Sequence, residues 1–324
     1  MKQKVQEKDM DASRLATEML CATEQEAAYE KALHKEIRNK WKRTAKGWLL
    51  LAPSLVFLSI FTIYPIMKSI ISSFYIDNLA VMELVFAGLK NYTADFQDKV
   101  FWECFFNNLL IAVVTVPCSI GLAVAMALFA NHVKKGKAIV RLGFTYPTFI
   151  PLVAAANIWM FIYTPIYGLL GYINPEWRFL ADGKTAIWAL IVMLIWKQAG
   201  YIMLFYVTGL HGISRELFEA ARIDGASSVQ IFSRITWPML KPTTIYVLII
   251  TLTNAYKMVD HLYIMTKGGP GNATNVLLFY IYQTGFDYWD TGKASAMTVL
   301  LVALLLIVTS VCFFVQDKKA YYND

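Results

Sequence analysis

A series of long apolar runs, separated by polar segments, constrains this chain more than any other feature of its sequence. The first run covers residues 48–67, and at about 1.5 Å per residue it is about long enough to cross the ~30 Å hydrocarbon core of a bilayer. Further runs have a similar length, and together they predict about six transmembrane helices. We expect these helices at residues 48–67, 106–130, 139–163, 185–207, 243–265 and 294–315.

The composition also indicates a chain that folds in a membrane. Hydrophobic residues make up 57% of the 324 residues and charged residues only 16%, whereas charged residues are usually about 25% of a soluble domain. We therefore predict an all-α, multi-pass protein of the cell membrane.

The distribution of positive charge predicts the orientation of the chain. The formal net charge is +7, and a basic balance is typical either of nucleic-acid binding or of cationic loops retained on the cytoplasmic side. The Lys and Arg clusters fall on alternate sides of the apolar runs, which favours the second interpretation. They lie in residues 31–46, 134–141, 215–241 and 318–319. We expect both termini in the cytoplasm and no nucleic-acid partner.

Changes in composition divide the chain into four parts. Residues 1–46 are polar and lack the early apolar core of a secretory signal, so they are predicted to form a cytoplasmic tail. This tail either extends into solvent and helps orient the first span, or docks to a partner. Residues 47–104 hold the first transmembrane helix and an acidic outer loop, residues 105–316 the transmembrane core, and residues 317–324 a second cytoplasmic tail.

The four cysteines, Cys21, Cys104, Cys118 and Cys312, form neither a CxxC pair nor a His/Cys cluster. This spacing predicts no metal site and no disulfide framework.

An amphipathic segment at residues 209–242 separates the fourth and fifth expected helices. Its pattern predicts two short helices. Ser214 is placed to cap the first helix, and Gly225 offers the left-handed conformation that closes such a helix. The second helix is expected to begin near Ala226 and to stop at Pro238. On pattern alone, the segment is also typical of an amphipathic helix that lies on lipid headgroups.

The residues of this segment resemble the EAA loop of binding-protein-dependent ABC importer permeases. The match consists of Glu219-Ala220-Ala221, three residues, Gly225, nine residues, and then Ile235 and Pro238. Asp224 and its neighbours extend the resemblance toward the carbohydrate-transporting branch. The usual leucine before the proline is Trp237 here, and Ser214 stands where proline is frequent.

Other parts of residues 47–316 resemble sugar and glycerol-3-phosphate permeases of the maltose-system type. The matching stretches are Trp196-Lys197, Gly200-Tyr201, Gly209-Leu210, Asp260, 263–266, Gly268-Gly269-Pro270, 272–274 and 280–282. The outer loop at 69–104 is shorter than the inserted domain of some maltose-type subunits, so maltose itself is not implied.

The resemblance implies how the chain would work and with which partners. The EAA loop would seat in a groove of an ATP-binding cassette subunit, with Glu219 making the polar contact, Ala220 and Ala221 permitting close packing, and Gly225 allowing the turn. Asp224 is counted with these four as a coupling residue. Two such ATPase subunits, a second permease subunit and an extracytoplasmic solute-binding protein would complete the assembly in membrane lipid. The chain has no GxxxxGK[ST] loop, so no cofactor is expected on it and ATP would bind a partner.

Polar residues within the expected spans are candidates for the substrate path, because they are costly in lipid unless they face a cavity or a partner. Asn254, Lys257 and His261 are expected on one face of the fifth span, with Asp260 close enough to pair with Lys257. The remaining candidates are Asn108, Lys197 and Tyr201. Alternatively, these residues pair with one another or with a second permease subunit, and Asp260 has a structural role in gating.

The sequence therefore predicts a permease subunit of an ATP-driven importer for a sugar or oligosaccharide, with glycerol-3-phosphate or a related polyol phosphate as the alternative cargo. A secondary transporter is a competing class, but no internal repeat with interrupted helices is found. A membrane-embedded enzyme is a third class, and a nucleophile elbow and a metal-spaced ligand set are both lacking.

Overall fold

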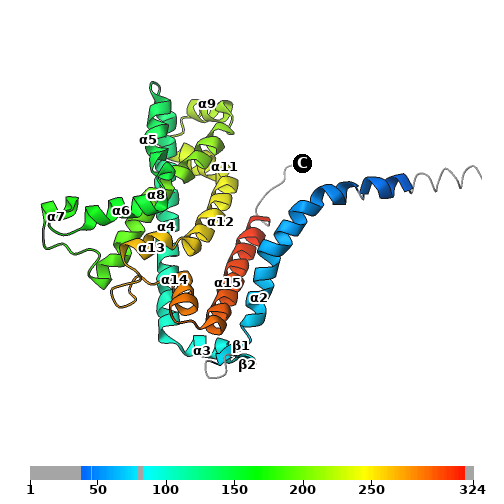
Figure 1. Ribbon diagram of the computed structural model, residues 1–324. Coiled ribbons are helices and arrows are strands. Elements are labelled where there is room, and N and C mark those ends of the chain that lie inside the picture. Colours follow the sequence, from blue (N-terminus) through cyan, green and yellow to red (C-terminus); the bar gives the residue numbers. More distant parts are fainter. Residues whose placement is uncertain (1–37, 45, 79–82, 318–324) are drawn as a thin grey trace, which may run out of the picture. The chain divides into compact units, whose positions relative to one another are not determined.

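The computed structural model describes residues 38–317 except 45 and 79–82 (Figure 1). The chain divides into two compact units, residues 1–68 and 69–324. The predicted N-terminal tail at 1–46 and C-terminal tail at 317–324 lie mostly outside the described residues.

The described part of the first unit is helical and belongs to the candidate span Arg38–Ser72. Within this span, the wider π-helical turn η1 (Ser59–Ile63) precedes α2 (Tyr64–Ser72). The helix is longer than the predicted range of 48–67, but it contains that range.

After the end of α2, the second unit continues with a small hairpin followed by a helix. Strands β1 (Tyr75–Asn78) and β2 (Glu83–Phe86) form an antiparallel hairpin in which Tyr75 is paired with Phe86. Helix α3 (Lys90–Gln97) follows, and the side-chain amide of Asn91 donates to the carbonyls of Ser73 and Tyr75, each at 2.8 Å. The hairpin adds a β element to the predicted all-α fold, although the membrane-spanning part is helical.

Two continuous helices, α4 (Lys99–His132) and α8 (Gly183–His211), form the centre of the second unit. They are long and apolar enough to cross a membrane, as is α15 (Thr291–Asp317) over the range Thr291–Phe314. The buried face of α4 contains many small residues, which allow close helix packing without a hydrophobic driving force. These are Ala112, Thr115, Ser119, Ala123, Ala127 and Ala130.

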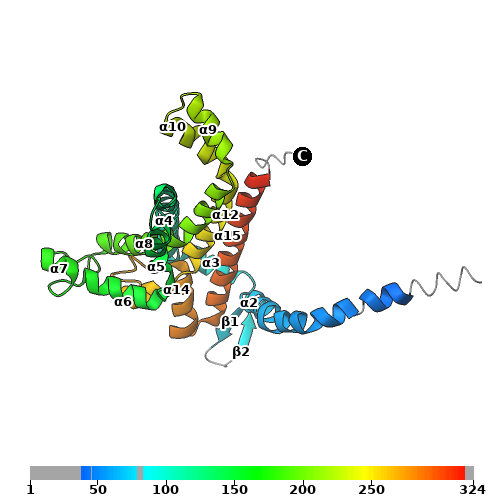
Figure 2. The same ribbon diagram turned by 90° about the horizontal axis from the view of Figure 1, so that it is seen from above.

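The predicted span at 139–163 is broken rather than continuous. Helix α5 (Lys137–Phe149) and helix α6 (Leu152–Tyr163) are bent by 95° relative to each other. In Figure 1 α5 is upright and α6 lies across the view, and Figure 2 shows α6 from above, extending away from α4. Ile150 between them is extended, with ψ of 127°. Pro151 explains the break, because a proline disfavours the helical conformation of the residue before it. A short helix, α7 (Leu169–Ile173), leads on toward α8.

The predicted helix stop at Pro238 is wrong. Helix α10 (Ser228–Ile231) continues through η2 (Phe232–Thr236) into α11 (Trp237–Met239), so Pro238 lies inside a helical run. Its missing N–H falls directly after the wide π-helical turn, where the hydrogen-bond register changes. The chain bends by 64° only after Met239, at the start of α12 (Lys241–Lys257), whose first turn contains Pro242.

The predicted fifth span at 243–265 is also divided, since extended Met258 separates α12 from α13 (Asp260–Met265). Helix α14 (Leu277–Tyr282) and η3 (Gln283–Asp287) complete the described elements before α15. By length and composition, the described residues contain four candidate spans, or up to six if each bent pair counts as one. This agrees with the predicted number.

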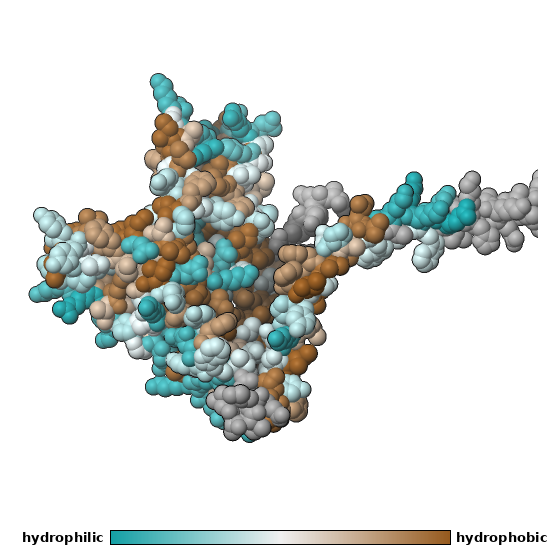
Figure 3. Space-filling view, viewed as in Figure 1, coloured by the Kyte–Doolittle hydropathy of each residue, from teal (hydrophilic) through white to brown (hydrophobic). Residues whose placement is uncertain are grey.

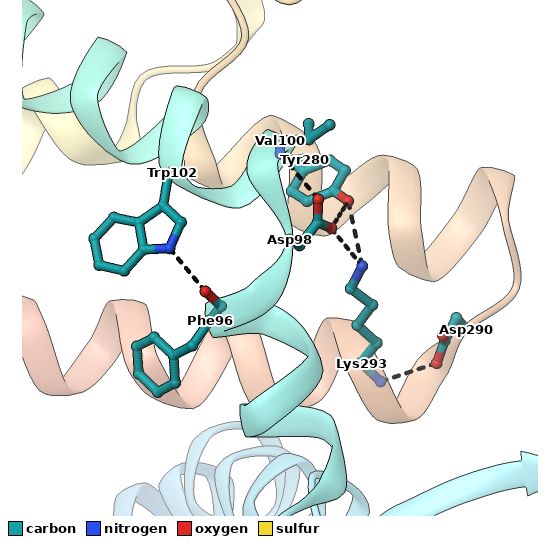
Figure 4. A network of polar contacts seen from close by, with 7 residues as sticks. All are labelled: Phe96, Asp98, Val100, Trp102, Tyr280, Asp290 and Lys293. Carbon is teal, nitrogen blue, oxygen red and sulfur yellow. Dashed lines mark hydrogen bonds and ion pairs between the residues drawn. The ribbon is translucent and has the colours of Figure 1, made fainter.

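An ionic network joins the start of α4 to α14 and α15 (Figure 4). One oxygen of Asp98 accepts hydrogen bonds from Lys293 Nζ and the Tyr280 hydroxyl, each at 2.6 Å. Its other oxygen caps α4 by accepting from the Val100 N–H at 2.9 Å. Burial by itself raises the pKa of Asp98, but these hydrogen bonds and the charge of Lys293 outweigh it and lower the pKa below its ordinary value.

Asp95, one turn before Asp98, lies in an opposite environment. Both of its carboxylate oxygens are buried and have no hydrogen-bond partner within the described residues. Burial raises the pKa of Asp95 to about 7; the nearby charges of Asp98 and Asp290 add to this effect, whereas Lys293 opposes it. Asp95 therefore holds its proton at a pH at which Asp98 is fully ionised.

We expect Lys293→Met to lower the thermal stability of the purified protein, because it removes a donor and a countercharge from the half-buried Asp98 carboxylate. A loss of about 1–3 kcal/mol is expected for a charge-assisted hydrogen bond of this kind. Thermal unfolding in detergent measures it. Lys99→Met is the control, because Lys99 pairs with Glu103 at 4.0 Å with its own side chain 90% exposed, and such pairs contribute little. An equal effect of the two substitutions would contradict this assignment.

A second expectation concerns pH. Because the pKa of Asp95 is higher in the folded than in the unfolded chain, its contribution to stability is fully present below about pH 4 and is lost as pH rises to about 7. Between pH 5 and pH 8, wild type should lose on the order of 1–2 kcal/mol more stability than Asp95→Asn. Thermal unfolding at both pH values tests this, and parallel pH profiles would refute it.

Candidate functional site: the α9–α10 elbow and the polar residues of the spans

Helix α8 leads directly into the predicted coupling segment. Its last residue is His211, and only Gly212, Ile213 and Ser214 separate it from α9 (Arg215–Ile223). Ile213 is buried in the main core cluster, which anchors this short connection. A side chain at Gly209 would meet Leu240 at 2.8 Å, so the end of α8 lies close to the start of α12. We call α9 and α10 together, residues 215–231, the elbow. The elbow is therefore connected at both of its ends to long helices.

The charges of α9 suit its helix dipole. Ser214 occupies the predicted N-cap position, but its side chain makes no capping hydrogen bond. Glu216 lies in the first turn and Arg222 in the last. An acidic group near the N-terminus and a basic group near the C-terminus of a helix are both stabilising.

Gly225 closes α9 as predicted, with φ of +76° in the left-handed region. The Gly225 N–H donates to the Arg222 carbonyl at 3.1 Å, and the Ala226 N–H donates to the Ala221 carbonyl at 2.9 Å. These two bonds define a Schellman motif, for which glycine is favoured. Ser227 and Gln230 then form a capping box that starts α10.

A groove of about 920 Å³ lies beside the elbow. One wall is the end of α4 and the loop before α5, with Asn131, His132 and Lys134, and the other is formed by α9, α10 and η2. Phe218, Ile231 and Phe232 contribute apolar surface. Lys134, Lys137, Arg215 and Arg222 make its charge mainly positive, with Glu219 as the carboxylate among them. Figure 3 shows hydrophilic residues gathered at this end of the second unit.

The predicted coupling residues lie together on the elbow. Glu219, Ala220, Asp224 and Gly225 are exposed and Ala221 is half-buried. Ile223 is 86% exposed, which is unusual for a large apolar side chain on a polar helix. The sequence interpretation missed Phe218 and the loop lysines as neighbours of Glu219. The cationic cluster at 134–141 was visible, but its proximity to α9 depends on the length of α4.

Asn108 and the neighbouring Asn107 satisfy backbone groups at the start of α14 and in the segment before it. Asn108 Oδ1 accepts from the Leu277 N–H at 2.7 Å, and its Nδ2 has no partner among the described residues. The Asn107 amide, which was not predicted, donates to the carbonyls of Asn272 and Asn275, each at 2.9 Å. The Asn108 amide nitrogen is therefore buried with two N–H donors that have no described acceptor.

Lys197 and Tyr201 lie one turn apart on α8 but have different surroundings. Lys197 Nζ donates to the carbonyls of Pro147 at 2.7 Å and Thr148 at 3.1 Å, and also to that of Ile150. Tyr201 is 38% exposed and packs edge-on against Phe205 with ring centroids 5.1 Å apart. Of the two, Tyr201 has the accessible side chain.

The predicted common face of Asn254, Lys257 and His261 does not exist, because the helix is interrupted at Met258. Asn254 is half-buried, whereas Lys257 and Asp260 are exposed and form no ion pair in the described chain. His261 is 2% exposed, and neither ring nitrogen has a described partner. No cluster of His, Cys, Asp or Glu in the described residues is suited to hold a metal ion.

Long apolar helices, two bent pairs and a polar elbow between two of the candidate spans define a multi-pass membrane protein. Residues 119–320 match the family of binding-protein-dependent transport system inner membrane components, and the chain belongs to this family. It is thus the inner-membrane permease component of an ABC importer rather than its ATPase, and ATP binds separate subunits. The secondary-transporter and membrane-enzyme alternatives are thereby set aside.

Relatives support this membership over most of the chain. The sulfoquinovosyl glycerol transport system permease protein SmoG of Agrobacterium fabrum is 35% identical, over 81% of this chain and 87% of its own. The sn-glycerol-3-phosphate transport system permease protein UgpA of Brucella abortus is 30% identical, and the match covers 85% of this chain and 96% of UgpA. The trehalose/maltose transport system permease protein MalF of Thermococcus litoralis is 32% identical, and the match covers 84% of this chain and 94% of MalF.

The fold is also shared with a solved structure. A chain of a bacterial ABC transporter involved in the import of the acidic polysaccharide alginate superimposes with a TM-score of 0.75, covering 86% of this chain and 99% of that one at 22% identity.

Proposed function

We propose that this chain admits a sugar or oligosaccharide, delivered by an extracytoplasmic binding protein, and that the α9–α10 elbow receives the movement of an ATPase. The observation that carries the proposal is the direct passage of α8 into an exposed elbow whose first helix, α9, carries Glu219 and is closed by a left-handed Gly225. A displacement of α9 would act on α8 through the short link at residues 212–214. It would act on α12 through the continuous helical run of α10, η2 and α11.

The elbow is assigned to the cytoplasmic side by its charge. Lys134, Lys137, Arg215 and Arg222 gather at this end of the unit, as the positive-inside rule requires. On this basis the tails at 1–46 and 317–324 are cytoplasmic, and the hairpin with α3 lies outside. Residues 105–316 form the permease core.

The surface around Glu219 and the groove is suited to the docking of a partner protein. Exposed Ala220 and Ile223 offer a small and an apolar contact, and the cations of the groove favour an acidic partner surface. We assign this surface to one of two ATP-binding cassette subunits. A second, related permease subunit would complete the membrane-spanning pair, and lipid would cover the remaining apolar surface.

The cargo is assigned from the relatives. Sulfoquinovosyl glycerol and trehalose/maltose, named for two relatives, contain sugar units, which favours a carbohydrate. The name of a third, sn-glycerol-3-phosphate, supports the alternative of a polyol phosphate. We retain Tyr201, Asn254, Lys257 and the free amide donors of Asn108 as candidate substrate contacts, with His261 and Asp260 as candidates for supporting the path.

Glu219→Ala should lower substrate uptake about tenfold, as expected for the loss of charge-assisted hydrogen bonds to the ATPase. ATP hydrolysis should no longer be stimulated by substrate and binding protein, although the permease still inserts. Uptake and ATPase activity in proteoliposomes measure both effects.

Glu216→Ala is the matched control, because Glu216 is an exposed carboxylate on the same helix that does not line the groove. This variant should keep uptake within about twofold of wild type, since an exposed charge contributes little. Normal coupling in the Glu219 variant, or equal loss in both variants, would refute the role of Glu219.

A further inference from the structure

The break between α5 and α6 leaves backbone carbonyls without their helical donors. In a continuous helix the Pro147 carbonyl would accept from residue 151, but Pro151 has no N–H. The Thr148 carbonyl loses its partner because Ile150 is extended and the chain turns by 95°. Within a bilayer such groups must be satisfied by the protein or by trapped water.

Lys197 supplies the missing donors from another helix. Its ammonium has three N–H bonds, and the three acceptors at the break are the carbonyls of Pro147, Thr148 and Ile150. The charge also faces the C-terminal end of α5, where a cation is stabilised by the helix dipole. All hydrogen-bonding capacity of this half-buried lysine is therefore used by one irregular stretch of backbone.

Helices α5 and α8 approach closely on the elbow side of this contact. A Cβ atom at Gly200, one turn after Lys197, would lie 2.1 Å from the Phe144 carbonyl oxygen, so the two backbones touch there. Nearer the elbow, a guanidinium nitrogen of Arg141 on α5 lies 3.3 Å from His211 Nε2 at the end of α8. On the other side of the break, the rings of Trp159 on α6 and Trp196 on α8 are 5.6 Å apart.

We propose that Lys197 is a positioning residue of the transport cycle, which ties the α5–α6 break to α8 so that a displacement of α8 reaches α6. The proposal rests on the proposed function, in which α9 receives the movement of the ATPase and α8 transmits it. It removes Lys197 from the substrate path, because no donor of its ammonium is left for a sugar hydroxyl.

The bend itself is measured by electron–electron distance spectroscopy between spin labels at two exposed positions, Leu142→Cys on α5 and Phe161→Cys on α6. The four natural cysteines are replaced, and the full chain is co-expressed with the other components of its transport system and reconstituted in lipid. Lys197→Met keeps the length of the side chain but removes its donors. We expect a shifted and broader distance distribution, and an uptake per inserted molecule about tenfold lower.

Two further variants distinguish positioning from general stability. Lys197→Arg retains a cation with several donors and should restore both the narrow distribution and uptake to within about twofold. Pro151→Ala returns an N–H that can reach the Pro147 carbonyl only if the helix continues through Ile150, which is extended in the wild type. Combined with Lys197→Met, it should therefore straighten the break, move the distance distribution to longer values and leave uptake low. A residue that served only the stability of the fold would give neither pattern among molecules that insert.

Lys184→Met is the matched control, because Lys184 is an exposed lysine on the same helix, and it should leave both readouts unchanged. A wild-type distribution in Lys197→Met, or an altered distribution with wild-type uptake, would overturn the proposal. Should Lys197→Met fail to insert, the Arg variant and the Pro151→Ala combination decide by the same criteria. Failure of the ATPase to co-purify with wild type would instead refute the proposed function, and the distance measurement would still test whether Lys197 holds the α5–α6 break.

Discussion

Every backbone N–H and carbonyl inside a bilayer has to find a partner within the protein, and the rest of this structure depends on that requirement. The continuous helix α8 meets it by itself, and α4 does so apart from the carbonyl one turn before Pro117, which has no N–H to offer. At the broken spans, side chains from neighbouring helices take over. Lys197 serves the break between α5 and α6, while Asn107 and Asn108 serve the start of α14 and the segment before it. Polar residues in the spans of this permease therefore support irregular backbone before they are available to a substrate.

The two ends of the second unit differ in their polar groups. At the end that contains α3, Asp98 accepts hydrogen bonds from Lys293 and Tyr280, and this network joins the beginnings of α4 and α15. At the other end, α4 and α8 are longer than a bilayer needs, and they carry a cationic groove and the elbow. A helix that is continuous from one end to the other suits the transmission of a displacement, because it has no joint at which the movement would be lost.

The sequence was sufficient to predict the features that depend on local patterns. Apolar length predicted the spans, and the spacing around Glu219 predicted an elbow closed by a left-handed Gly225. It was not sufficient for features that depend on distant residues. Pro151 was visible, but a proline near a helix can kink it, end it or be tolerated, and the 95° bend depends on contacts of α6 with helices distant in the sequence, among them α13 and α8.

Lys197 illustrates this limit most clearly. A lysine in an apolar run indicates a functional residue by default, yet its three acceptors lie close to 50 residues earlier in the chain. Asp98 and Lys293 are 195 residues apart, and neither residue has a distinctive sequence pattern. The prediction of one face for Asn254, Lys257 and His261 failed for a related reason, because it assumed a continuous helix through Met258.

The central claim, that the α9–α10 elbow faces the cytoplasm and contacts an ATPase, is tested most directly at Ile223, which is 86% exposed at the end of α9. A cysteine placed at this position in a cysteine-free chain is offered a membrane-impermeant maleimide from outside the cell and a short crosslinker during ATP turnover. We expect no labelling from outside and a crosslinked product that contains the ATPase subunit. Labelling from outside, or the absence of that product in an actively transporting complex, would contradict the account.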